Sequence, residues 1–265
     1  MIGVFDIGVG GLSVVKTLKD KNADYPILYF GDTGRLPYST KPPEDRLRYS
    51  IQDAEFVVKH GAEILVIACN TISAVAGPEI ERRFGLPTFN VIDAGVRVAA
   101  RVTTNKRIGI IGSKALTESP VYPERLRSLD PEIETFLKNC QLFVYLIEEN
   151  YLGYPETFGI ARNLLDDFNR QGIDTLILGC THFPLLRAEI QAAVGSGVTL
   201  VDPAVEIAGM VAEYLDGRPE IRDRLTRDRE DVYYISGDSP QVFREIARRF
   251  LGREIERVEM MSWDG

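Results

Sequence analysis

Two cysteines occupy matched positions in the chain, and thiols are side chains that can carry proton-transfer chemistry. Cys69 follows the apolar run 64–68, and Cys180 follows a second apolar run, 175–179. Each cysteine precedes Thr or Asn-Thr and then a predicted helix, whose N-terminal partial positive charge stabilises a thiolate. A single cysteine of this kind usually packs in the core as a small apolar residue. Two of them in matched positions favour a catalytic function.

Two further side chains could assist the thiols. Asp6 ends an apolar run and precedes the glycine loop 8–11, where the backbone could approach a small anionic ligand. The spacing of this loop matches neither the dinucleotide-binding fingerprint nor the P-loop. His182 lies two residues after Cys180, so it could hold the sulfur ionised or move its proton. No metal site is expected, because Cys180 and His182 form the only close Cys/His pair.

The composition is that of an ordinary globular protein. Of 265 residues, 31 are Lys or Arg and 39 are Asp or Glu, which gives a net charge of −8. This acidic balance disfavours binding to nucleic acid or to an anionic membrane. No apolar run approaches the roughly 18 residues of a membrane span, and the first residues do not resemble a signal peptide. Three cysteines without a CxxC pair indicate reduced thiols in the cytoplasm, with Cys140 interpreted as structural.

Short apolar, β-branched runs alternate with amphipathic stretches along the chain. The amphipathic stretches 44–60 and 155–170 predict helices that end at Gly61 and Gly172. The apolar runs are nearly continuous, as in strands that are covered on both faces. They lie at residues 2–5, 27–30, 64–68, 89–92, 108–111, 143–147, 176–178 and 198–201. This alternation predicts the α/β class, with parallel sheets between layers of helices.

The two cysteine segments suggest that the chain has two similar halves. The cysteines are 180 − 69 = 111 residues apart, and segment 4–11 resembles segment 110–115. Such pairing predicts two α/β domains, and chance similarity between strand ends is the alternative. Crossings between the halves are expected at 93–100 and 202–209. The predicted domains are therefore residues 1–93 with 210–265, and residues 94–209.

Taken together, these segments resemble the glutamate racemases of the aspartate/glutamate racemase superfamily, which are cofactor-independent enzymes that supply D-glutamate for peptidoglycan. The two cysteine motifs together are highly specific for this family, and the resemblance spans nearly the whole chain in the correct order. The matching segments are 3–6, 8–11, 29–33, 35–38, 68–71, 179–186, 201–204 and 236–238.

The resemblance implies a site in the cleft between the two domains, with one cysteine on each side of the substrate Cα. One thiolate removes the α-proton while the other thiol delivers a proton to the opposite face. The implied catalytic residues are Cys69, Cys180, Asp6, His182 and Glu148. The positions implied to bind the amino acid are Ile7, Pro37, Tyr38, Ser39, Asn70, Thr71, Ser113, Leu116 and Thr181. No pyridoxal phosphate or other cofactor is implied, and a homodimer is a possible assembly.

The chain departs from the family pattern at three of these positions. Ile7 and Leu116 replace hydroxyl residues, and Ser39 replaces a glycine. Because both cysteines are retained, we expect the reaction type to be intact and recognition of the substrate carboxylate to be altered. Neighbouring backbone groups could compensate. The alternatives are a racemase or epimerase acting on aspartate, a hydantoin or a neutral amino acid, and a non-catalytic amino-acid-binding protein, which would not require paired thiols.

Overall fold

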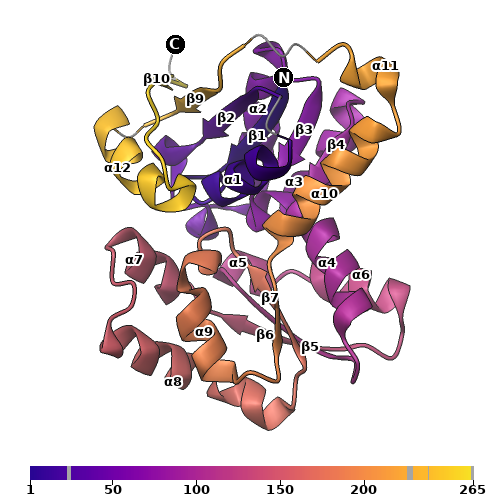
Figure 1. The fold of residues 1–265 in the computed structure, drawn as a ribbon, viewed down its shortest axis with the longest axis vertical. Coiled ribbons are helices and arrows are strands. Elements are labelled where there is room, and N and C mark those ends of the chain that lie inside the picture. The colour runs from indigo at the N-terminus through magenta and orange to yellow at the C-terminus, as the bar shows by residue number, and fades with distance from the viewer. Residues whose placement is uncertain (23–24, 226–228, 238, 264–265) are drawn as a thin grey trace. The chain divides into compact units, whose positions relative to one another are not determined.

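The chain folds into two compact units, which Figure 1 shows in a computed structural model that describes residues 1–22, 25–225, 229–237 and 239–263. The first unit comprises Met1–Val91 and Ala204–Gly265, and the second comprises Ile92–Pro203. The chain changes unit at the first residue of helix α4 (Val91–Val102) and at the first residue of helix α10 (Pro203–Asp216). The domain boundaries predicted after residues 93 and 209 fall inside these two helices.

The first unit is built on a six-stranded sheet in which every strand pair is parallel. The strand order is β10-β9-β2-β1-β3-β4. Strands β1, β2 and β3 are buried along their whole length, as their continuous apolar sequences predict. The strands are β1 (Ile2–Asp6), β2 (Ile27–Gly31), β3 (Ile64–Ile67), β4 (Thr88–Asn90), β9 (Val232–Ile235) and β10 (Val258–Met260).

Helices cover both faces of this sheet, and two neighbouring residues of β2 show how. Tyr29 contacts Phe243 of α12 with ring centroids 6.2 Å apart, whereas Phe30 contacts Phe56 of α2 at 4.6 Å. Since successive side chains of a strand point to opposite faces, α12 and α2 lie on opposite sides. The helices of this unit are α1 (Leu12–Lys21), α2 (Pro43–Lys59), α3 (Asn70–Phe84), α10, α11 (Pro219–Arg222) and α12 (Pro240–Leu251), with 3₁₀ turns η1 (Thr33–Arg35) and η2 (Tyr38–Thr40).

The second unit contains a four-stranded parallel sheet in the order β6-β5-β7-β8. Its strands are β5 (Arg107–Gly112), β6 (Glu134–Asn139), β7 (Thr175–Gly179) and β8 (Thr199–Val201). Its helices are α4, α5 (Lys114–Thr117), α6 (Val121–Leu129), α7 (Leu142–Glu148), α8 (Pro155–Gln171) and α9 (Arg187–Val194), and the 3₁₀ turn η3 (Phe183–Leu186) precedes α9. Helix α8 ends at Gly172, whose φ of +63° is typical of a glycine that terminates a helix.

The two sheets share one strand order. In the first unit β2, β1, β3 and β4 follow one another across the sheet, and β6, β5, β7 and β8 do so in the second. Strand β1 therefore corresponds to β5, and each leads into a glycine turn. Strand β3 corresponds to β7, and a cysteine follows each of them. The prediction of two parallel-sheet α/β units is confirmed by this arrangement.

Several predicted elements were wrong. The apolar run 143–147 is not a strand but lies in helix α7, where Phe143 and Ile147 are buried one helical turn apart. The strand of this region is β6, whose residues are exposed or half-buried and therefore carry little apolar signal. The run predicted at 89–92 is a strand only as far as Asn90. Strands β9 and β10 were not predicted.

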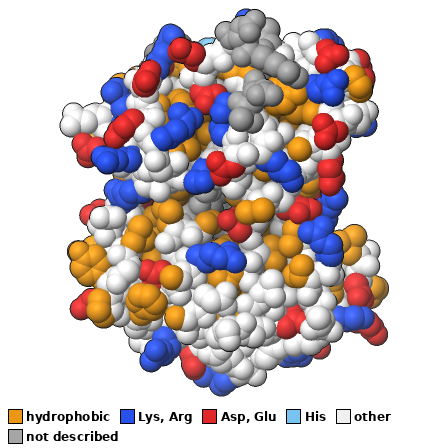
Figure 2. Space-filling view, viewed as in Figure 1, with side chains coloured by type: hydrophobic (Ala, Val, Ile, Leu, Met, Phe, Trp, Pro, Cys, Tyr) orange, Lys and Arg blue, Asp and Glu red, His pale blue; other side chains and the backbone are white. Residues whose placement is uncertain are grey.

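Large apolar side chains are exposed around α7 and the start of α8. Leu142, Tyr145, Tyr151 and Tyr154 are between 45% and 57% exposed, and Figure 2 shows hydrophobic side chains gathered over this part of the second unit. Exposed apolar surface of this kind is typical of interaction sites. The homodimer stays a prediction.

The packing of β1 against α2 predicts a matched pair of glycine variants. A Cβ on Gly3 would lie 2.5 Å from the Ala62 Cβ, whereas a Cβ on Gly77, inside α3, would meet nothing within 4 Å. We expect Gly3→Ala to lower the free energy of unfolding by about 1–3 kcal/mol through overpacking. Gly77→Ala should raise it by about 0.5–1 kcal/mol, because alanine loses less backbone entropy in a helix. Urea denaturation of both variants measures these changes, and equal stabilities would contradict this account of the packing.

Candidate active site

In the first unit, a glycine loop folds back over the ends of β1 and β2. Asp6, the last residue of β1, is 2% exposed, and its Oδ1 accepts a hydrogen bond from the Gly8 amide at 3.0 Å. The Tyr29 hydroxyl donates to the Gly8 carbonyl at 2.6 Å. A Cβ on Gly11 would lie 2.7 Å from the Asp6 Cβ, and one on Gly31 would lie 2.6 Å from the Gly8 oxygen. The loop can reach the strand ends only because glycine occupies these positions.

Cys69 lies at the N-terminus of helix α3, two residues after β3 ends. Its backbone is extended and its residue is 6% exposed. The Ser73 amide and hydroxyl both donate to the Cys69 carbonyl, at 2.9 and 2.8 Å. Asn70 and Thr71 form the first turn of α3, and both are buried. Cys69, Asn70 and Thr71 are therefore placed together where the positive end of the helix dipole is strongest.

Tyr29 links the two features electrostatically. Burial raises the pKa of its hydroxyl well above the usual range, and the charges of Asp6 and Cys69 raise it further, against a hydrogen bond with the Gly11 backbone. Asp6 and Cys69, at the carboxyl ends of β1 and β3, thus both lie within electrostatic reach of the Tyr29 phenol. Ligands bind at this edge in open parallel α/β sheets.

The segment after β2 contains three of the positions implied to bind substrate. Tyr38 is fully buried, and its hydroxyl donates to Asp32 and lies 3.0 Å from Asp53 Oδ2. Burial, followed by the charges of these two carboxylates, raises the pKa of Tyr38. Because the phenol is engaged in this way, the backbone of Pro37 and Tyr38 is what this turn offers to a ligand. Ser39 belongs to the same turn, and its side chain lies outside the described part of the structure.

In the second unit, Cys180, His182 and Glu148 form a connected series. The Cys180 sulfur lies 3.8 Å from Nδ1 of His182, and Nε2 of His182 lies 3.0 Å from Oε1 of Glu148. Burial disfavours a charged imidazole, but hydrogen bonds to Cys180 and Glu148 outweigh it and raise the pKa of His182 to about 10. At neutral pH this histidine is therefore a cation that lies beside the Cys180 sulfur.

Packing of α7 on η3 brings this series together. The Phe143 ring of α7 meets the Phe183 ring of η3 edge-on, with centroids 5.5 Å apart. Glu148 is the last residue of α7, and His182 immediately precedes η3. Helix α7, which was predicted to be a strand, therefore positions the assisting carboxylate of Glu148.

The remaining predicted residues of this unit lie near the same strand ends. The Ser113 hydroxyl accepts a hydrogen bond from the Leu116 amide at 3.3 Å and caps α5. Leu116 is 1% exposed, and its Cδ2 is 2.6 Å from where a Cβ on Gly112 would lie. Its side chain therefore belongs to the core of the unit. Thr181 is 9% exposed and lies between Cys180 and His182.

Two residues bear on the departures from the family pattern and on the third thiol. Ile7 is partly buried and packs against the apolar core of the first unit. Cys140 is 1% exposed, and burial raises the pKa of its thiol to about 12, so that it stays neutral, as a structural residue would.

The described part of the chain offers neither a metal site nor a membrane-spanning helix. Over the described ranges, no three His, Cys, Asp or Glu side chains are grouped so that they could hold a metal ion. None of the helices described has both the length and the apolar character needed to cross a membrane.

A polar cluster beneath the turn at residues 37–40 was not predicted from the sequence. Asp32 and Asp53 are both fully buried, and Arg35 lies between them with 12% of its side chain exposed. Burial and the charge of Asp32 raise the pKa of Asp53 well above its usual range. An aspartate on the same face of α2 as Ala54 and Val57 was the signal available in the sequence.

The family model of Asp/Glu/hydantoin racemases matches residues 9–211 of this chain. The chain belongs to this family and is a racemase of the isomerase class. The glutamate racemase of Geobacter metallireducens is 40% identical over 261 residues, which cover 98% of this chain and 96% of that protein. The structure of glutamate racemase from Francisella tularensis in complex with D-glutamate is 33% identical, has a TM-score of 0.90 and covers 99% of this chain and 97% of that one. A glutamate racemase isoform from Bacillus anthracis has a TM-score of 0.91 at 30% identity, with the same coverage.

The contacts of His182 predict its titration. Its pKa of about 10 is raised above the unfolded value of about 6.5. The stabilisation that it provides is therefore complete below about pH 6.5 and is lost as the pH rises through about 10. We expect Glu148→Gln to lower the pKa of His182, because the amide removes the negative partner.

NMR titration of the imidazole signals measures this pKa. The chain has two histidines, and His60→Gln leaves only the signal of His182. A midpoint near 6.5 in the unmodified protein, or no change in Glu148→Gln, would contradict the prediction.

Proposed function

We propose that this racemase interconverts L- and D-glutamate without a cofactor, with Cys69 and Cys180 as the two proton-transfer groups, and that it supplies D-glutamate for peptidoglycan. The observation that carries the proposal is the equivalent placement of the two thiols. Each follows the corresponding strand of a sheet with the same strand order, and each has an ionisable partner of its own.

Inversion at Cα requires a base on one face of the substrate and an acid on the other. One thiolate takes the α-proton, and the electron pair of the broken C–H bond moves into the substrate carboxylate. The opposite thiol then donates its proton to Cα, so that the thiolate and the thiol exchange places. In this scheme Cys69 acts on one enantiomer and Cys180 on the other.

Each thiol is activated by different local chemistry. The His182 cation, oriented by Glu148, lies beside the Cys180 sulfur and places a positive charge there. Near Cys69 the ionisable groups are the Tyr29 phenol and the buried Asp6 that interacts with the same phenol, and a carboxylate cannot stabilise a thiolate by charge attraction. The N-terminal dipole of α3 supplies that stabilisation instead.

Substrate binding falls to groups that lie at the same strand ends. The carboxylates of glutamate require donors, which the amides of the glycine loop 8–11 and of the first turn of α3 can provide. Thr71 and Thr181 add hydroxyls next to the two cysteines. These preorganised donors would stabilise the negative charge that develops when the α-proton leaves.

Glutamate is favoured over an apolar amino acid by the surroundings of the substituted positions. Leu116 lies in the core of the second unit, and Ile7 packs against the core of the first. Neither substitution therefore requires an apolar side chain on the substrate. Buried polar positions at Asn70, Thr71 and Thr181 favour a polar ligand.

The proposal is tested by incubating the pure protein with L-glutamate in D₂O without cofactor. Loss of the circular dichroism signal together with replacement of the α-proton by deuterium, followed by NMR, is the expected result. Racemisation of aspartate or a neutral amino acid, with glutamate unchanged, would overturn the assignment of substrate. Binding without any α-proton exchange across this panel would indicate a non-catalytic protein.

The roles of the thiols predict the effects of removing each one. Cys69→Ala and Cys180→Ala should each lower the rate of racemisation by at least about 10³-fold, since each removes an acid–base group that the reaction cannot replace. Cys140→Ala is the matched control, and its activity should stay within about twofold of the unmodified protein. Far-UV circular dichroism checks the fold of all three. Near-normal turnover in either of the first two variants would exclude the two-thiol mechanism.

A further inference from the structure

A single buried carboxylate joins three separate parts of the first unit. Asp32 follows β2 directly and is 0% exposed. It accepts hydrogen bonds from Arg35 Nε, the Tyr38 hydroxyl, the Ser236 hydroxyl at 2.7 Å and the Trp263 indole N–H at 2.9 Å. Arg35 and Tyr38 belong to the segment after β2, Ser236 follows β9, and Trp263 follows β10. We call these five residues the Asp32 cluster.

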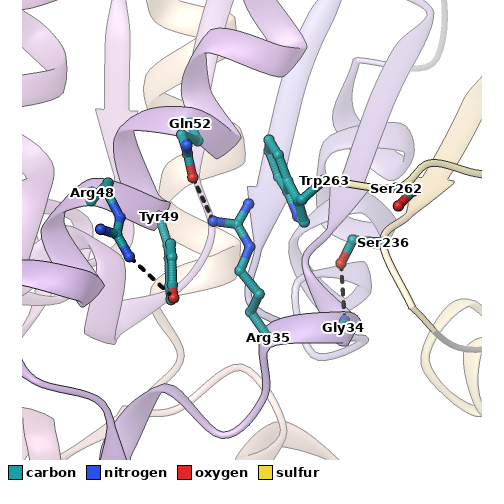
Figure 3. A pocket seen from close by; sticks show the side chains of 8 residues that line it. All are labelled: Gly34, Arg35, Arg48, Tyr49, Gln52, Ser236, Ser262 and Trp263. Carbon is teal, nitrogen blue, oxygen red and sulfur yellow. Dashed lines mark hydrogen bonds between the residues drawn. The ribbon is translucent and has the colours of Figure 1, made fainter. Parts of the chain in front are cut away.

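Trp263 contributes more than one contact to this cluster. Its ring lies 3.6 Å from the Arg35 guanidinium, which is held from the other side by the Tyr49 ring at 4.3 Å. Figure 3 shows the guanidinium between the two rings, with its hydrogen bond to Gln52. The Trp263 ring also meets Phe30 edge-on at 5.8 Å. Trp263 lines an open pocket of about 570 Å³ together with Arg35, Tyr49 and Gln52.

Pairing of the strands at the edge of the sheet places Trp263 in this position. Strand β10 pairs with β9, and the Met261 amide continues the pairing with a hydrogen bond to the Ile235 carbonyl at 2.9 Å. The Ser236 amide in turn donates to the Gly31 carbonyl, one residue before Asp32. The ends of β2, β9 and β10 are therefore fixed to one another, and Trp263 closes the assembly.

We infer that Trp263 is a positioning residue for amino-acid binding, acting through Asp32 and Tyr38 on the turn at Pro37 and Tyr38. The inference rests on the proposed function and on the implied binding of the amino acid at Pro37 and Tyr38. The indole N–H fixes the Asp32 carboxylate, and that carboxylate fixes the Tyr38 phenol. A turn held in advance loses less entropy when the substrate binds to its backbone.

Measurement of KM and kcat distinguishes this positioning role of Trp263 from a purely structural role. Trp263→Phe keeps an aromatic ring over Arg35 but removes the only donor that Trp263 offers to Asp32. We expect the KM for both enantiomers of glutamate to rise about tenfold, as for loss of one hydrogen bond to a charged group, with kcat within about twofold. Ser236→Ala, which removes another donor to Asp32, should act in the same direction. Met260→Ala, at an exposed position of the same segment, is the control and should leave both constants unchanged.

A structural role for Trp263 would give a different pattern. Loss of folded protein lowers the apparent kcat and the melting temperature while leaving the KM of the remaining enzyme unchanged. That pattern in Trp263→Phe, or unchanged kinetics, would overturn the inference.

Hydrogen–deuterium exchange without substrate tests the same inference independently of activity. We expect the backbone amides of residues 33–41 to exchange faster in Trp263→Phe than in the unmodified protein and in Met260→Ala. Faster exchange in a protein that does not racemise glutamate would refute the proposed function while supporting the action of Trp263 on the turn. Unchanged exchange over these residues would refute the action of Trp263 whatever the activity.

Discussion

Close packing that only glycine permits organises the carboxyl ends of both sheets. In the first unit the backbone of the loop 8–11 lies against Asp6 and Gly31, where a Cβ would come within 2.7 Å of its neighbours. In the second unit Gly112 and Gly179 leave the space that the Leu116 side chain fills. Because the strand ends are packed in these two ways, the residues that come after each strand are held in fixed positions. Both thiols, and the polar groups around them, depend on this closure.

The two halves of the proposed site are alike in backbone and unlike in charge. Cys180 has a cationic partner in His182, whereas the groups near Cys69 are a carboxylate and a buried phenol. The same strand order thus presents one thiol beside a cation and another at the N-terminus of a helix. The proposed reaction requires one sulfur to be charged while the other carries a proton, and the two sulfurs exchange these states in each turnover.

The sequence predicted the parts of the fold that depend on burial alone. Strands covered on both faces have continuous apolar sequences, so β1, β2, β3, β5 and β7 were located to within two residues. The run in α7 was misassigned because a short apolar stretch does not distinguish a strand from a helix. Cys180, His182 and Glu148 were expected to act together, and the structure places them in contact. The Asp32 cluster could not be predicted, since residues 32, 236 and 263 meet only through the pairing of three strands.

The course of the chain through the two units has a consequence for biosynthesis. All four strands of the second unit lie within one continuous stretch, residues 92–203, whereas β9 and β10 of the first unit are encoded near the C-terminus. A ribosome therefore releases every strand of the second sheet before the first sheet has its full set. The unit that contains the N-terminus is completed after the second unit, and Trp263 contacts Asp32, a residue synthesised more than two hundred codons earlier.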